Sequence, residues 1–137
     1  MSDDASDTFR QEAQELLEQL EQALLKLESR PGDMDLIDSA FRALHTIKGS
    51  GAMFGFDRVA AFTHHIETAF DLVRKGKIAV TDELIMLTLA AKDWMRRLIE
   101  SPDDAEDAAG QAILARFQIA VDGAIVAADP VDDGPSN

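Results

Sequence analysis

Cysteine is absent from this sequence of 137 residues. That absence excludes disulfide scaffolds, thiolate metal sites and cysteine nucleophiles. The sequence also lacks any apolar run of the roughly 18 residues that a membrane-spanning helix requires. Its acidic start, Met1 to Asp7, has neither the basic region nor the apolar region of a signal peptide. We therefore expect a cytoplasmic protein without membrane insertion.

Basic residues are scarce: 13 lysines and arginines stand against 26 aspartates and glutamates, and the net charge is −13 with neutral histidines. A surface this acidic repels phosphate backbones and anionic lipids, which argues against nucleic acid and membrane surfaces as partners. Hydrophobic residues make up 46% and charged residues 28%, close to the globular average, so extensive disorder is excluded. The length suits a single domain.

Apolar residues recur at steps of three and four in five stretches, and no stretch shows the sustained alternation of a strand. Capping residues, prolines and glycines mark the boundaries. The first predicted helix follows a cap at Asp7 or Thr8 and ends at 29–32. The second runs from 33–35 to the glycines at 49–55. The other three cover 56–74, 81–101 and 106–127. The apolar residues expected to face the core include Leu16, Phe41, Trp94 or Met95, and Ile125.

Short connections between long amphipathic helices force antiparallel neighbours. The predicted fold is therefore all-α, an up-and-down antiparallel helical bundle. Helices of about 20 residues would each be roughly 30 Å long. We expect the domain to cover residues 1–128, and the polar, breaker-rich residues 129–137 to form an acidic tail or linker.

The most informative stretch is the second predicted helix around His45. Leu44 and Ile47 face the core, and His45, rotated about 100° from Leu44, falls on the boundary with solvent. Lys48 and Gly49 follow on the same face as His45. An ammonium group therefore lies beside the imidazole, and no side chain blocks approach from that end. Such an imidazole is open to a bulky anionic group or to another protein.

The other two histidines lie in the third predicted helix, in the segment 63–67. His64 and Glu67 project from one face, towards the second helix if the two helices are antiparallel neighbours. Glu67 would then accept a hydrogen bond from Nδ1–H of His45, which fixes the tautomer and leaves the Nε2 lone pair free. A histidine oriented in this way is a nucleophile suited to phosphoryl transfer, with Lys48 offsetting the charge of the phosphoryl oxygens.

Four segments carry a resemblance to a known family: FRALHTIKGS at 41–50, FGF at 54–56, THHIE at 63–67 and KDWM at 92–95. In these segments the chain resembles the histidine-containing phosphotransfer (HPt) domain, and more narrowly the N-terminal P1 domain of the chemotaxis histidine kinase CheA. The fifth predicted helix agrees in length and position. His65 departs from the resemblance, since an apolar residue is expected there.

The resemblance implies that His45 is the phosphorylated residue and that Glu67, Lys48 and His64 form the hydrogen-bonding cluster around it. It also implies a five-helix bundle whose first four helices form the phosphotransfer core. The sequence shows no Gly-rich nucleotide loop, so we expect this domain to bind no cofactor itself. ATP and Mg²⁺ would be supplied by a CheA-type kinase core, in cis or in trans, and by the response regulator.

The implied acceptor is an aspartate of a response regulator of the CheY or CheB type. We expect the regulator to dock over the exposed strip near His45, where Gly49 leaves room and Met53 and Phe54 offer apolar contacts. The acidity of the chain predicts that partners contribute basic residues, so association should weaken with salt. The isolated domain is expected to be monomeric.

Two other classes of function stay open at this level. His45, His64, His65 and Glu67 offer ligands for zinc or iron, although adjacent histidines point about 100° apart on a helix and do not readily join one site. A non-catalytic interaction or scaffold bundle would need none of these residues. His45 would then be a boundary histidine packed on a neighbouring helix, and the nearby glycines would serve close helix packing.

Overall fold

The computed structural model describes residues 4–126, which contain five α-helices and one short 3₁₀-helix. These elements are α1 (Asp4–Leu27), α2 (Met34–Met53), α3 (Asp57–Arg74), α4 (Asp82–Glu100), η1 (Pro102–Asp104) and α5 (Asp107–Gly123). None of the helices in this range combines the length and the apolar character that crossing a membrane requires. The expected domain end at residue 128 and the expected tail lie outside the described residues.

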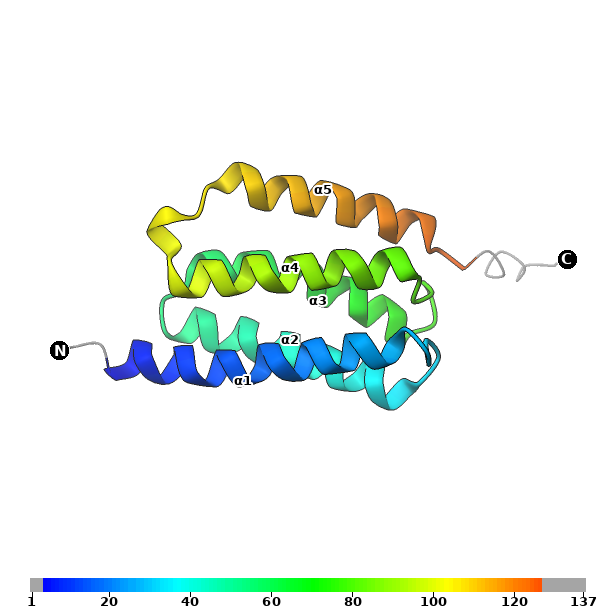
Figure 1. The fold of residues 1–137 in the computed structure, drawn as a ribbon, viewed down its shortest axis with the longest axis horizontal. Coiled ribbons are helices and arrows are strands. Elements are labelled where there is room, and N and C mark those ends of the chain that lie inside the picture. The colour runs from blue at the N-terminus through cyan, green and yellow to red at the C-terminus, as the bar shows by residue number, and fades with distance from the viewer. Residues whose placement is uncertain (1–3, 127–137) are drawn as a thin grey trace, which may run out of the picture.

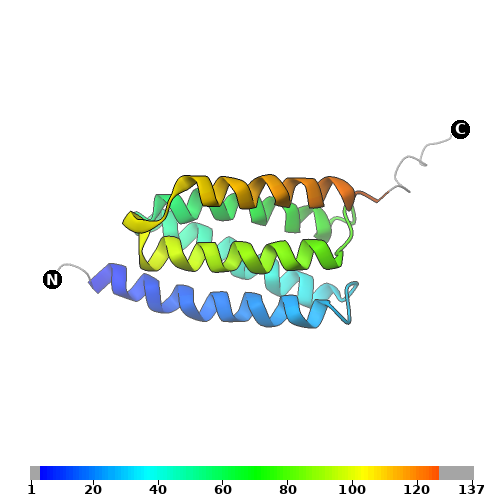
Figure 2. The ribbon, with the colours of Figure 1, turned by 45° about the horizontal axis from the view of Figure 1, so that its top comes forward.

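The first four helices form an up-and-down bundle (Figure 1). α1 packs against α2 and α4, and α3 packs against the same two helices, so the four close around one core. α5 lies outside this ring, packed on α4 and touching α3 (Figure 2). Within residues 4–126 the only β pairing is an isolated antiparallel bridge between Ile78 and Ile125. The predicted all-α bundle is confirmed.

Capping residues set two of the helix starts as predicted. The Asp33 side chain accepts hydrogen bonds from the first turn of α2, and the Thr81 hydroxyl accepts one from a backbone N–H of α4. The predicted start of the first helix is wrong, because α1 already begins at Asp4. Asp7 lies inside the helix, where its carboxylate pairs with Arg10 at 3.4 Å. Its negative charge also interacts favourably with the positive, N-terminal end of the helix dipole.

The predicted core agrees with the structure in most stripes and differs at Leu16, at Ile125 and at Phe41, which is only partly buried. At this point of the α1 stripe the buried residue is Leu17, whereas Leu16 is only partly covered. Met95 of α4 is fully buried, and Trp94 packs at the boundary. Ile125 is 59% exposed because it lies beyond the end of α5.

The last helix is shorter than predicted because the chain after it pairs with another loop. α5 ends at residue 123 and not near 127. The Ala79 N–H donates to the Ala124 carbonyl at 2.8 Å, and the Val126 N–H donates to the Lys77 carbonyl at 3.1 Å. These bonds tie the end of α5 to the connection between α3 and α4.

Candidate functional site

The candidate site lies at the solvent edge of the interface between α2 and α3. The two helices approach closely at Gly51, where an added Cβ would lie 3.3 Å from Val59 Cγ1. Such close packing brings polar side chains along the edge into contact. His45 and Lys48 come from α2, and Glu67 comes from α3.

His45 is exposed and is held from one side by Glu67. The His45 side chain is 63% exposed, whereas the Glu67 side chain is 8% exposed. His45 Nδ1 lies 2.6 Å from Glu67 Oε2. A carboxylate only accepts hydrogen bonds, so the Nδ1–H group is the donor. In the neutral ring the lone pair is therefore on Nε2.

Lys48 contacts the other oxygen of the same carboxylate. Its Nζ lies 2.7 Å from Glu67 Oε1. Glu67 therefore joins His45 and Lys48, with one of its two oxygens on each. The ammonium group that the sequence places beside the imidazole is thus already ion-paired within the domain.

Two opposing effects act on the pKa of the Glu67 carboxyl group. Burial raises this pKa, because the charged form is poorly solvated there. The ion-pair contact with Lys48, the hydrogen bond from His45 and the positive charge of these groups lower it and outweigh the burial. The pKa of Glu67 is therefore lowered from its ordinary value of 4.5, and the group is a carboxylate at neutral pH.

His64 lies at the rim of the cluster. Its Nδ1 is 3.6 Å from Glu67 Oε1, which is an ion-pair contact only when His64 is protonated. The expected place of His64 in the hydrogen-bonding network is therefore corrected: no hydrogen bond to Glu67 forms at this distance. The reason is that α3 turns this side chain towards solvent, where it stays largely exposed.

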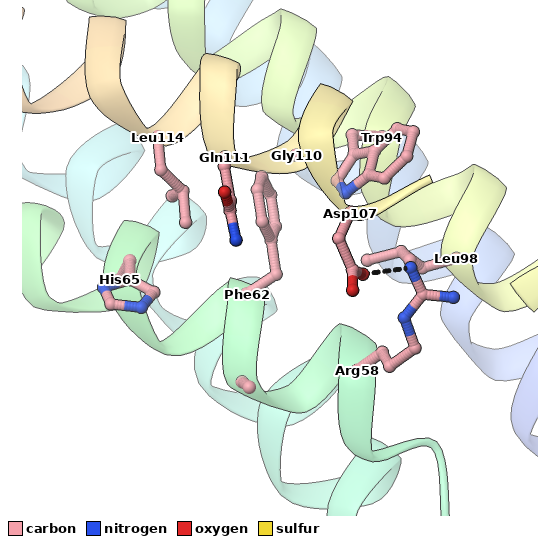
Figure 3. A pocket seen from close by; sticks show the side chains of 10 residues that line it. Arg58, Phe62, His65, Trp94, Leu98, Asp107, Gly110, Gln111 and Leu114 are labelled. Carbon is pink, nitrogen blue, oxygen red and sulfur yellow. Dashed lines mark hydrogen bonds and ion pairs between the residues drawn. The ribbon is translucent and has the colours of Figure 1, made fainter. Parts of the chain in front are cut away.

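His65 lies apart from the His45 cluster and beside α5. It lines a cavity of about 260 Å³ together with Phe62, Trp94 and Leu114 (Figure 3). Adjacent residues on a helix differ in direction by about 100°, and the His65 ring is tilted against that of His64, with centroids 6.3 Å apart. Across the described part of the chain, no group of three or more potential ligands is placed to hold a metal ion.

The predicted docking strip is only partly exposed. Gly49 is exposed, and a Cβ at this position would have no neighbour within 4 Å. Met53 is 77% exposed. Phe54 is half-buried, because its ring packs against the core, with its centroid 6.1 Å from that of Phe9. Gly49 and Met53 are therefore the exposed members of the strip, Phe54 is partly exposed, and docking of a regulator there stays a prediction.

Two residues at the site were missed by the sequence analysis, which assigned Phe41 to the core and left Arg74 aside. Phe41 is half-buried, and its ring is stacked with the His45 ring, with centroids 5.9 Å apart and planes 11° apart. The Arg74 guanidinium carbon lies 4.1 Å from the centroid of Phe41. The spacing of four residues between Phe41 and His45 is a signal for the first contact. The second contact has no sequence signal, because it depends on how α2 and α3 pack.

Comparison with known proteins places this geometry in a family. Residues 4–101 match the Hpt domain. The chemotaxis protein CheA of Borreliella burgdorferi is 38% identical over 91 residues, which are 66% of this chain and 10% of that protein. The chain therefore spans a tenth of the length of this relative.

Two solved structures share the fold. The P1 domain of CheA3 from R. sphaeroides, solved phosphorylated and in complex with CheY6, has a TM-score of 0.79 at 24% identity, covering 89% of this chain and 98% of that chain. The CheA phosphotransferase domain from Thermotoga maritima has a TM-score of 0.71 at 35% identity, covering 74% of this chain and 97% of that chain. The chain belongs to the Hpt domain family, among the phosphotransfer domains of CheA proteins.

Proposed function

We propose that this domain carries a phosphoryl group on Nε2 of His45, from a kinase to a response regulator. One observation carries the proposal: an exposed imidazole whose Nδ1 lies 2.6 Å from the buried carboxylate of Glu67. Phosphoryl transfer depends mainly on positioning and on neutralising charge, and Glu67 positions the ring. The exposure of His45 lets a large donor and a large acceptor reach Nε2 in turn.

In the first step, the Nε2 lone pair attacks the γ-phosphorus of ATP. An N–P bond forms, the bond from the γ-phosphorus to its bridging oxygen breaks, and ADP leaves with that electron pair. The ring becomes positively charged while Nδ1 keeps its proton. Glu67 stabilises this charge at the Nδ1–H group, and Lys48 supplies positive charge towards the phosphoryl oxygens.

In the second step, an aspartate oxygen of the regulator attacks the phosphorus. The N–P bond breaks, and its electron pair returns to Nε2, so the ring is neutral again with its proton still on Nδ1. We assign ATP and its Mg²⁺ to the kinase core, in cis or in trans, and a further Mg²⁺ to the regulator. The domain itself needs only the side chains around His45 for its part.

We assign the donor to a CheA-type kinase core and the acceptor to a regulator of the CheY or CheB type. The CheA3 domain that shares this fold was solved with CheY6, which supports a CheY-type partner. Gly49 lies about one turn and Met53 about two turns beyond His45 on α2, and both exposed residues would contact the regulator. Because ATP is the donor, we place the transfer in the cytoplasm.

We also propose that the isolated domain is a monomer. The large apolar side chains exposed in the described residues are distributed over α1, α2, α4, α5 and the segment after α5, and single exposed apolar residues are normal on a soluble protein. These residues are Leu25, Met34, Met53, Met86, Ile119 and Ile125.

Incubation of the domain with a CheA-type kinase core and ATP labelled in its γ-phosphate tests the phosphotransfer. The domain should acquire label that is stable in base and lost in acid, and should pass it to a CheY-type receiver. His45→Gln should abolish labelling. His64→Gln and His65→Gln are the matched controls and should still be labelled. Retention of label by the His45→Gln variant would contradict the proposal.

A further inference from the structure

We infer that Phe41, held in place by Arg74, is a positioning residue that sets the plane of the His45 imidazole. The inference rests on the proposed phosphotransfer and extends the orientation of His45 from one nitrogen to the whole ring. It starts from three planar groups on two helices: the imidazole and the phenyl ring on α2 and the guanidinium group at the end of α3.

The local geometry of α2 brings the two rings together. Side chains on an α-helix lean towards its N-terminus, so His45 leans over the residue four positions earlier, which is Phe41. The ring planes differ by 11°, and the centroid distance of 5.9 Å lies in the range of offset stacking. Phe41 therefore lies beside one face of the imidazole.

Arg74 in turn fixes the phenyl ring. Its guanidinium carbon lies 4.1 Å from the Phe41 centroid, within the range of cation–π contacts. Arg74 Nε lies 3.4 Å from Asp38 Oδ1 on α2, and Arg74 Nη1 lies 3.4 Å from Asp71 Oδ1 on its own helix. These two carboxylates hold the guanidinium group over the ring, so α3 restrains Phe41 from outside the core.

The hydrogen bond to Glu67 fixes only one point of the His45 ring. With Nδ1 held 2.6 Å from Oε2, the ring of an exposed side chain can still tilt, and the tilt redirects the lone pair on Nε2. A second contact against the ring face restricts this tilt. Since the rate of transfer depends on how well the lone pair is aligned with phosphorus, loss of the stack should slow the chemical step and leave binding unchanged.

A second arginine–phenylalanine pair at the other end of the α2–α3 hairpin provides a matched control. The Arg10 guanidinium carbon lies 5.3 Å from the centroid of Phe56, a half-buried residue in the connection between α2 and α3. The Phe56 ring packs on Phe9, with centroids 4.6 Å apart. Replacing Phe56 therefore removes a comparable ring and cation–π contact without touching the stack on His45.

Single-turnover phosphorylation by the kinase core, at several concentrations of the domain, tests the inference. Phe41→Leu should lower the maximal rate about 3- to 10-fold, the size expected for one aromatic contact, with KM for the domain unchanged. Phe41→Tyr should restore the rate, and Phe56→Leu should transfer at the wild-type rate. A wild-type rate for Phe41→Leu, or equal slowing by Phe56→Leu, would overturn the inference.

A readout without the kinase separates this inference from the proposed function. Residual dipolar couplings of the His45 ring report the spread of its orientations in solution. The spread should increase in Phe41→Leu and Arg74→Gln and stay as in the wild type in Phe56→Leu. If His45→Gln still accepted label, the phosphotransfer assignment would fail. The couplings would then still test, by themselves, whether the stack with Phe41 restricts the His45 ring. An unchanged spread in Phe41→Leu would overturn it.

Discussion

The interface between α2 and α3 and the attachment of α5 are held by different kinds of contact. α2 and α3 pack along continuous stripes of buried residues, with a close approach of Gly51 to Val59. The solvent edge of this interface carries the Glu67 carboxylate, with an imidazole on one oxygen and an ammonium group on the other. Packing and charge therefore restrain the same part of the molecule.

α5 is held at its two ends and at one close approach between them. At its start, Arg58 of α3 donates to backbone oxygens of the α4–α5 connection and pairs with Asp107 at 2.7 Å (Figure 3). Further along, a Cβ at Gly110 would lie 2.6 Å from Trp94 Nε1. Beyond its end, the chain pairs with the loop that precedes α4.

The polar and ring contacts of His45 come from α2 and α3, so we expect its orientation to depend on this interface and not on α5. An exposed side chain can be oriented only by partners that are themselves fixed, and Glu67 and Phe41 are fixed by packing between these two helices. α5 covers α4 and lines the cavity beside His65, away from the cluster. Substitutions in the two regions should therefore separate phosphotransfer from stability.

The largest effect is expected at Glu67. Glu67→Ala should lower the rate of phosphorylation of His45 about 10- to 100-fold, because the ring loses the acceptor that orients it. The initial rate with a kinase core measures the effect, and circular dichroism verifies that the variant is folded. Glu15→Ala, on the exposed face of α1, should leave the rate unchanged. A wild-type rate in Glu67→Ala would show that the ring does not need this carboxylate.

An intermediate effect, on stability, is expected at Gly110. Gly110→Val should lower the free energy of unfolding by about 1–3 kcal/mol, since the new side chain has no room against Trp94. Denaturant unfolding measures this, and the fluorescence of the single tryptophan reports any displacement of α5. Gly123→Val is the control in the same helix, because a Cβ there has no neighbour within 4 Å. Loss of His45 phosphorylation in Gly110→Val would contradict the expectation that the orientation of His45 does not depend on α5.

The smallest effect is expected on the pH dependence of the free energy of unfolding, through ionisation of the Glu67 carboxyl group. Its carboxyl group has a lower pKa in the folded chain than its ordinary value of 4.5, so ionisation of Glu67 stabilises the fold above that pH. This contribution is lost as the pH falls from 4.5 through the lowered pKa. Denaturant unfolding of the wild type and of Glu67→Gln should therefore give free energies that converge as the pH falls from 7 to 3. A constant difference would contradict the lowered pKa.

Helix positions could be predicted because their determinants are local. Apolar periodicity and the caps at Asp33 and Thr81 act within one or two turns, and these helices begin as the sequence indicates. Local rules fail where two neighbours fit equally well. Either Leu16 or Leu17 satisfies the stripe of α1, and only the directions of the surrounding helices choose Leu17.

The candidate site could be predicted in its residue types and only partly in its geometry. Spacing and resemblance single out His45, Lys48 and Glu67, and the structure brings these three together. They do not reveal that His64 stays beyond hydrogen-bond distance, which depends on how far α3 is rotated against α2. They also do not reveal the contact of Arg74 with the ring beside His45, which joins the two ends of the α2–α3 hairpin.

The sequence by itself determined the number and approximate extent of the helices, the all-α class, the family and the histidine at the centre of the site. Tertiary structure alone decided that His45 and Lys48 contact different oxygens of one carboxylate, and which aromatic ring stacks on the imidazole. The physical reason is a difference in range. A helix forms from contacts a few residues apart, whereas the rotation and register between two helices result from packing all the side chains between them at once.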